Sequence, residues 1–167
     1  MLSVSASTGF APCPAPFNLA AHVLGRAADL GDKTALAIVG PDRVEAWRFD
    51  QLEAAVRGTA TGLLGMGLRP GDIVLMRLGN TVDFPLAYLG ALAAGLVPVP
   101  TAAALTEPEV AAIIATLAPK AILRDPAVPC PPNDTTVDLA QLRSMRDLPA
   151  APWHMGDPDR LGYIIYT

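Results

Sequence analysis

The fold is decided by one stretch, residues 69–101, which reads RPGDIVLMRLGNTVDFPLAYLGALAAGLVPVPT. Arg69 to Asp72 predicts a turn, because proline fixes φ at its first corner and glycine accepts a positive φ at its second. Ile73 to Leu78 predicts a short apolar strand, Leu86 to Ala94 a buried helix and Leu96 to Pro100 a second strand. A helix that joins two strands in this way forms a right-handed βαβ unit in nearly every case.

The same stretch allows a second interpretation as a membrane span. No charged residue occurs from Phe84 to Thr106, which is about the length that a transmembrane helix needs. Three prolines and two glycines interrupt this run, however, and no cluster of Lys or Arg flanks it. The βαβ unit is therefore the favoured interpretation.

The segments on either side also alternate between strand and helix patterns. In chain order, we expect a helix from Asn18 to Gly31, a hairpin of strands Thr34 to Val39 and Val44 to Phe49, a helix from Asp50 to Met66, a helix from Thr106 to Leu117, a strand from Lys120 to Arg124, and a small strand and helix within Val137 to Leu142. Asp50 with Glu53, and Thr106 with Glu109, have the spacing of capping boxes. The last segment, LGYIIYT from Leu161 to Thr167, is rich in β-branched and aromatic residues and predicts a buried strand.

The fold class that follows is α/β: an open, mostly parallel sheet with helices on both faces, plus an N-terminal β-hairpin. A chain of 167 residues is long enough for one domain with its own core. Residues 1–16 are uncharged and rich in Ser, Ala and Pro, so we expect a loose leader followed by a domain over residues 17–167.

Composition excludes several classes of function. The net charge of −4 and the absence of a basic run argue against a nucleic-acid-binding protein. Two cysteines, Cys13 and Cys130, and two histidines, His22 and His154, lie too far apart in the sequence to indicate a metal site. We expect both thiols to be reduced and the protein to be cytoplasmic.

No complete active site can be read from the residues alone. The segment Gly31-Asp32-Lys33-Thr34 resembles only the end of a phosphate-binding loop, and an aspartate interrupts it. Gly62, Gly65 and Gly67 have the wrong spacing for a dinucleotide-binding fingerprint. Neither histidine has a recognisable nucleophile or carboxylate partner. We therefore assign no catalytic and no metal-binding residue.

Three segments in order resemble the start of an adenylate-forming enzyme, the family of acyl-CoA synthetases, aryl-CoA ligases, luciferases and peptide-synthetase adenylation domains. They are WRFDQLEAAVRGTATGLLGMGLRPGD (47–72), LGNTVDFPLAYLGALAAGLVPVPT (78–101) and LGYIIYT (161–167). The second is most similar to bacterial acyl-CoA and benzoate-type CoA ligases. The third resembles the lead into the family's ATP phosphate loop.

This resemblance implies that the chain is the N-terminal subdomain of an AMP-forming acyl- or aryl-CoA ligase, truncated before the phosphate loop. It implies that Thr167 begins that loop and that Tyr166 precedes it. The full-length enzyme would use ATP, Mg²⁺, CoA and a small carboxylate substrate. The fragment alone is expected to bind none of them, to be inactive and to self-associate through exposed apolar surface.

Two other classes of function remain open at this point. The chain could be a free-standing α/β binding or interaction module without catalysis. It could also be a nucleotide-binding oxidoreductase domain, although the missing glycine fingerprint argues against this class.

Overall fold

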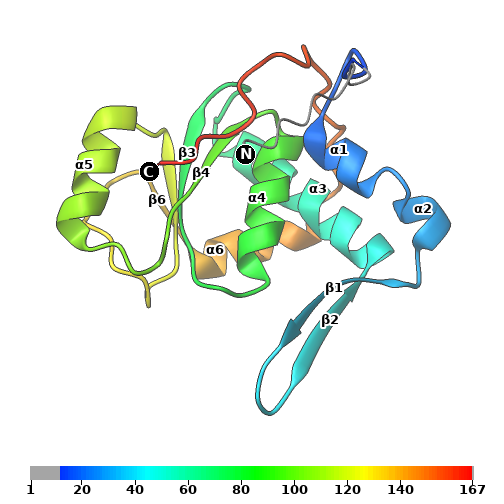
Figure 1. The fold of residues 1–167 in the computed structure, drawn as a ribbon, viewed down its shortest axis with the longest axis horizontal. Coiled ribbons are helices and arrows are strands. Elements are labelled where there is room, and N and C mark those ends of the chain that lie inside the picture. The colour runs from blue at the N-terminus through cyan, green and yellow to red at the C-terminus, as the bar shows by residue number, and fades with distance from the viewer. Residues whose placement is uncertain (1–11, 167) are drawn as a thin grey trace, which may run out of the picture.

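A computed structural model describes residues 12–166 and places two sheets among its helices (Figure 1). The elements are α1 (Leu19–Leu24), α2 (Ala27–Leu30), β1 (Thr34–Val39), β2 (Val44–Arg48), α3 (Phe49–Gly65), β3 (Ile73–Arg77), α4 (Asp83–Ala93), β4 (Val97–Pro100), α5 (Glu107–Leu117), β5 (Ala121–Arg124), β6 (Thr136–Asp138), α6 (Leu139–Ser144) and the 3-10 helix η1 (Met145–Asp147). The predicted leader lies mostly outside the described residues, and residues 12–16 form no helix or strand.

The main sheet has four parallel strands in the order β4-β3-β5-β6. β3, α4 and β4 form the predicted βαβ unit, with Val74 of β3 opposite Pro98 of β4. On its other side, Val74 lies opposite Ala121 of β5, so β3 is an inner strand. The segment without charges is split between α4 and β4, and no helix of residues 12–166 is both long and apolar enough to cross a membrane.

Helices cover both faces of this sheet, as predicted. Val74 and Met76 of β3 pack into a large core with residues of α3 and α4. Leu75 points to the opposite face and packs with Val110 and Ile113 of α5. In Figure 1, α5 lies on one side of the sheet, and α3 and α4 lie on the other. The alternation of side chains along β3 therefore fills two separate cores.

Helices α3 and α4 pack closely because a glycine lies at their contact. The predicted inward residues of α3, which include Leu52, Val56 and Leu63, are buried. A Cβ atom placed on Gly90 of α4 would lie only 2.7 Å from Cγ2 of Thr59. The absence of a side chain at Gly90 thus allows the two helices to approach.

The predicted helix starts are partly confirmed. Asn18 caps α1, since its Oδ1 accepts a hydrogen bond from the Ala21 amide at 3.1 Å. The expected single helix is wrong, because the chain breaks after Leu24 into two short helices at Gly25 and Arg26. Glycine favours such a break, since it stabilises a helix interior poorly.

The two predicted capping boxes had different outcomes. Thr106 and Glu109 form theirs at the start of α5, where the Thr106 amide donates to Glu109 at 2.8 Å. The box at Asp50 is wrong, because α3 begins one residue earlier. The Arg48 amide donates instead to Oε1 of Gln51 at 3.1 Å, and Asp50 pairs with the Arg48 guanidinium. Both acidic residues lie in the first turn, where the helix dipole favours them.

Strands β1 and β2 form the predicted N-terminal hairpin, which projects from the body in Figure 1. Near its tip, the side chains of Val39 and Val44 are 76% and 63% exposed. The base of the hairpin is held more firmly, because Trp47 packs against the main core.

The prediction of a buried terminal strand is wrong. Residues 161–166 form no strand, and Leu161 and Ile165 are 58% and 64% exposed. One backbone hydrogen bond, from the Ile164 amide to the Pro98 carbonyl at 3.1 Å, ties the segment to the outer edge of β4.

The prolines of β4 explain why this pairing stops at one bond. The Val97 amide donates to Asp72 on the β3 side at 2.9 Å, so alternate residues Pro98 and Pro100 face the outer edge. Proline has no N–H, so this edge can accept hydrogen bonds but cannot donate them at these positions. A regular parallel ladder needs both.

Restoring the two donors should let the ladder form. In the variant Pro98→Val/Pro100→Val, we expect the Ile164 and Tyr166 amides to exchange with deuterium about tenfold more slowly, since a net hydrogen bond contributes about 1 kcal/mol. Val99→Ile is the control, because the Val99 amide faces β3 and its edge pattern does not change. Equal exchange rates in the proline variant and the parent would contradict this explanation.

Candidate functional site

The carboxyl ends of the parallel strands are where an open α/β sheet usually binds ligands. From β3 the chain crosses through α4 to β4 on one side, then returns past β3 to β5 on the other. The topological switch point therefore lies between β3 and β5. Arg77 and Arg124 end these two strands and lie opposite each other in the register.

Protein atoms fill this switch point. The Arg77 side chain is fully buried and donates hydrogen bonds to loops that follow β4 and β5. Its partners are the carbonyl oxygens of Pro129 (2.7 and 3.1 Å), Ala102 (2.7 Å), Ala103 (3.4 Å) and Leu105 (3.2 Å), and the hydroxyl of Thr101 (3.0 Å). The guanidinium thus fixes both loops at the point where a ligand could otherwise enter.

The environment of Arg77 is unusual for a buried charge. No carboxylate within residues 12–166 forms a salt bridge with it. Burial lowers the pKa of Arg77 from its ordinary value, because the charged form loses its hydration. Carbonyl dipoles take the place of a counter-ion. The sequence reasoning did not single out Arg77, although a charged residue at the end of an apolar strand was a usable signal.

The segment that would lead into a phosphate loop lies at the other side of the sheet, along β4. The Tyr163 ring packs edge-on against Tyr88 of α4, with ring centroids 6.1 Å apart. Tyr166 is 44% exposed, and Thr167 lies outside the described residues. The position of the predicted ATP-binding Thr167 is therefore not tested by the structure.

The model of the family described as AMP-binding enzyme matches residues 25–167. The chain belongs to this family. The match includes the βαβ unit and the segment along β4, so it supports the resemblance even though residues 161–166 do not form the expected strand.

Curated relatives include the benzoate–CoA ligase of Thauera aromatica, which is 34% identical over 97 residues, or 56% of this chain and 18% of that protein. The 4-coumarate–CoA ligase 5 of rice (Oryza sativa subsp. japonica) is 29% identical over 64% of this chain and 19% of its own length. The chain thus spans less than a fifth of these relatives.

Solved structures agree on the fold. A benzoate CoA ligase from Burkholderia xenovorans LB400 superposes with a TM-score of 0.74 at 23% identity, over 88% of this chain and 32% of that one. A fatty acyl CoA synthetase of Mycobacterium tuberculosis gives 0.76 at 24% identity, over 90% and 32%. At these identities the likeness shows the fold of an adenylate-forming N-terminal region.

The described residues offer few groups for a metal or for catalysis. Within residues 12–166, no group of three His, Cys, Asp or Glu side chains could hold a metal ion. His154 is packed against Gly95, and His22 stacks on Phe17 with centroids 5.5 Å apart. Burial raises the pKa of the Cys130 thiol, which disfavours the reactive thiolate. The assignment of no catalytic residue stays a prediction for the complete protein.

A second cluster of charged residues lies near the hairpin, centred on the buried Asp83. The Arg143 guanidinium donates two bonds to Asp83, at 3.0 and 2.8 Å, and Arg146 donates a third. Burial of Asp83 opposes ionisation, but the bonds from Arg143 and Thr81 and the charge of Arg146 outweigh it and lower the pKa of Asp83. The bond to Asp83 correspondingly raises the pKa of Arg143. Asp83 is therefore ionised at neutral pH.

Arg77 should be the most costly surface-remote charge to remove. We expect Arg77→Leu to lower the free energy of unfolding by about 3 kcal/mol, because several buried acceptors lose a charged donor at once. Urea unfolding followed by circular dichroism would measure this. Arg69→Leu, in an exposed turn, is the matched control and should change stability by less than about 0.5 kcal/mol. Similar stabilities for the two variants would refute the proposed clamp.

Proposed function

We propose that this chain is the N-terminal portion of an AMP-forming acyl- or aryl-CoA ligase. The match of residues 25–167 to the AMP-binding enzyme family carries this proposal, and the relatives named benzoate–CoA and 4-coumarate–CoA ligase support it. In such a reaction a carboxylate attacks the α-phosphate of ATP, which gives an acyl-adenylate and pyrophosphate. The thiol of CoA then attacks the acyl carbon and AMP leaves.

The role of this chain in that reaction would be to position the ATP phosphates. Residues 161–166 lie along β4, so Tyr166 and then Thr167 would lead into the phosphate loop from this edge. A glycine-rich loop offers backbone N–H groups to phosphate oxygens. Mg²⁺ would neutralise phosphate charge, and it usually binds through the phosphates with few protein ligands.

The proposal predicts that the 167-residue chain alone is inactive. Mixed with ATP, CoA and a panel of aliphatic and aromatic carboxylates, it should release no pyrophosphate, because most of the proposed site lies beyond residue 167. The reading frame past codon 167 should continue with a Ser-Gly and a Pro-Lys, and the longer protein should release pyrophosphate only with a carboxylate present.

In that longer protein, Thr167→Val should lower kcat by about 100-fold, as expected for loss of one donor to a phosphate. The control is Thr116→Val, because Thr116 is exposed and donates only to the Ala112 carbonyl of its own helix at 2.8 Å. Turnover by the 167-residue chain, or a native stop codon after Thr167, would refute the proposal and favour a free-standing binding module.

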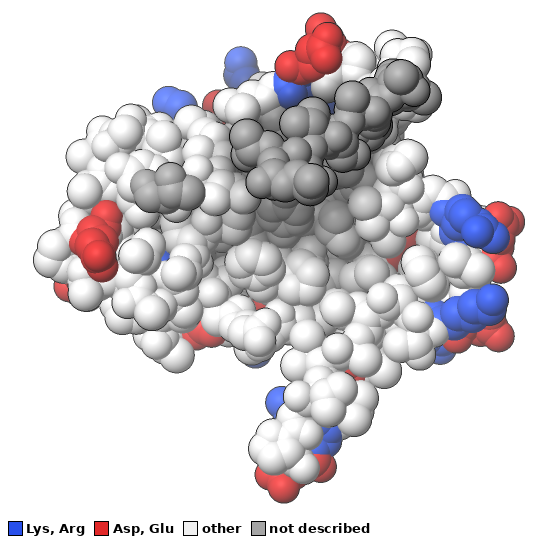
Figure 2. All heavy atoms as spheres, viewed as in Figure 1, with Lys and Arg blue, Asp and Glu red and all other residues white. Residues whose placement is uncertain are grey.

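We also propose a cytoplasmic location and self-association of the 167-residue chain. The exposed apolar residues near its end are Met155, Leu161, Tyr163, Ile165 and Tyr166. Figure 2 shows that charged side chains lie mainly at the margins of the face drawn there, so little charge would oppose contact.

Static light scattering should therefore give a mass above 17.4 kDa that rises with protein concentration. Leu161→Ser/Ile165→Ser should shift the mass toward the monomer, whereas Val39→Ser/Val44→Ser at the hairpin tip should not. A monomeric mass for the parent chain at high concentration would contradict this expectation.

A further inference from the structure

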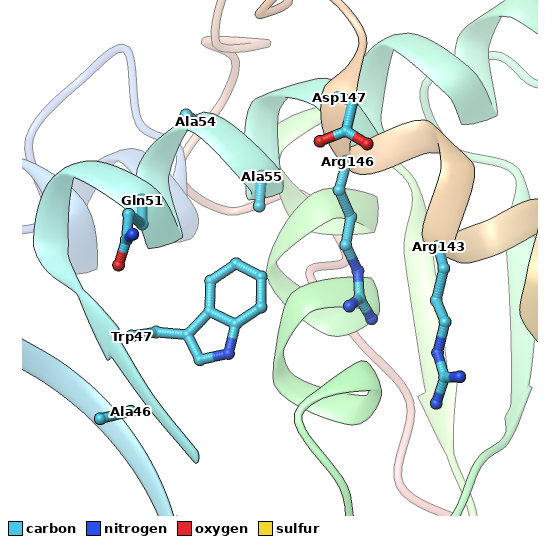
Figure 3. A pocket seen from close by; sticks show the side chains of 8 residues that line it. All are labelled: Ala46, Trp47, Gln51, Ala54, Ala55, Arg143, Arg146 and Asp147. Atoms are coloured by element: carbon cyan, nitrogen blue, oxygen red, sulfur yellow. The ribbon is translucent and has the colours of Figure 1, made fainter.

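A cavity of about 490 Å³ lies between the hairpin, the start of α3 and the α6–η1 segment (Figure 3). Its lining residues are Ala46, Trp47, Gln51, Ala54, Ala55, Arg143, Arg146 and Asp147. The volume falls in the range of small-molecule sites, about 300–1,000 Å³. None of these residues belongs to the segment along β4, so this cavity is separate from the proposed ATP site.

One side of the cavity is flat and apolar. The Trp47 indole forms its wall, and the methyl groups of Ala54 and Ala55 lie beside it in Figure 3. The Trp47 Nε1–H donates to Glu45 at 2.9 Å, which fixes the orientation of the ring. A fixed indole face next to small side chains accommodates another planar ring by stacking.

The other side carries two guanidinium groups. Figure 3 shows Arg143 and Arg146 extending from the α6–η1 segment, with Arg146 nearer the indole. The Arg146 guanidinium carbon lies 5.7 Å from the Trp47 ring centroid. Two positive side chains therefore lie beside the aromatic wall.

These two guanidinium groups share a single buried carboxylate. Asp83 is 1% exposed and accepts from Nε and Nη2 of Arg143, but only from Nη2 of Arg146. Nε of Arg146 is buried and has no hydrogen-bond partner among residues 12–166. Asp83 neutralises one of the two charges, so one positive charge and several N–H donors are left for a ligand.

We propose that this cavity binds a small planar aromatic carboxylate. The ring of the ligand lies on the indole and the alanine methyl groups, and its carboxylate accepts hydrogen bonds from Arg143 and Arg146. A single spare charge matches a monoanion better than a phosphate dianion. Asp147 at the rim opposes the ligand charge and limits affinity.

Benzoate is a suitable probe, with benzamide as its neutral analogue. The chain contains two tryptophans, so Trp153→Phe leaves Trp47 as the only indole reporter. Without ATP or CoA, we expect benzoate to change the Trp47 fluorescence saturably and benzamide to bind at least about tenfold more weakly.

Three variants in the Trp153→Phe background test the contacts. Arg143→Gln should weaken benzoate binding about tenfold, while Arg146 still pairs with Asp83. Asp147→Asn should tighten it severalfold, because it removes a repelling charge. The matched control is Arg43→Gln, since Arg43 lines only the neighbouring cavity of about 410 Å³ and should leave binding unchanged.

Urea unfolding of each variant separates loss of binding from loss of folding. No saturable signal with benzoate, equal affinity for benzamide, or an unchanged affinity in a folded Arg143→Gln variant would overturn the proposal. Because the titration contains no ATP or CoA, such a result would leave the ligase proposal intact. Absence of ligase activity in the longer protein would likewise leave this site standing.

Discussion

The structure depends on one buried guanidinium. Arg77 ends the inner strand β3 and holds the loops after β4 and β5 through hydrogen bonds to their carbonyl groups. Burying a charge without a counter-ion is costly unless each polar atom is satisfied, and here the carbonyl dipoles supply that compensation. The three central strands β4, β3 and β5 are thus linked at their carboxyl ends by a single side chain.

The sequence was sufficient to predict the order of the elements because the apolar periodicity is strong. The βαβ unit, the hairpin, the capping box at Thr106 and the small β6–α6 unit follow from local patterns. The failures lie where local signals compete. At the start of α3, Gln51 competes with Asp50 as the capping partner. At Leu161 to Tyr166, strand propensity is overridden by the prolines of the neighbouring strand, which that segment's own sequence does not reveal.

Candidate sites were harder to predict than the fold, since their residues meet only through long-range packing. Asp83 and Arg146 are 63 positions apart, and neither has a local motif. Trp47 reaches the same place from the hairpin. Tyr166 and Thr167 could be proposed only because LGYIIYT resembles a family motif. A short motif can indicate one end of a site, whereas a cluster built from three elements becomes visible only in the folded chain.

The closed switch point and the open edge of β4 are two consequences of the same design. Arg77 occupies the crevice where an open α/β sheet would normally bind its ligand. The edge of β4 offers carbonyl acceptors but no N–H at Pro98 and Pro100, so the segment beside it is held by one bond. A loop attached there is aimed by the sheet without being locked into it. This arrangement suits a loop that must close around a nucleotide and then release its product.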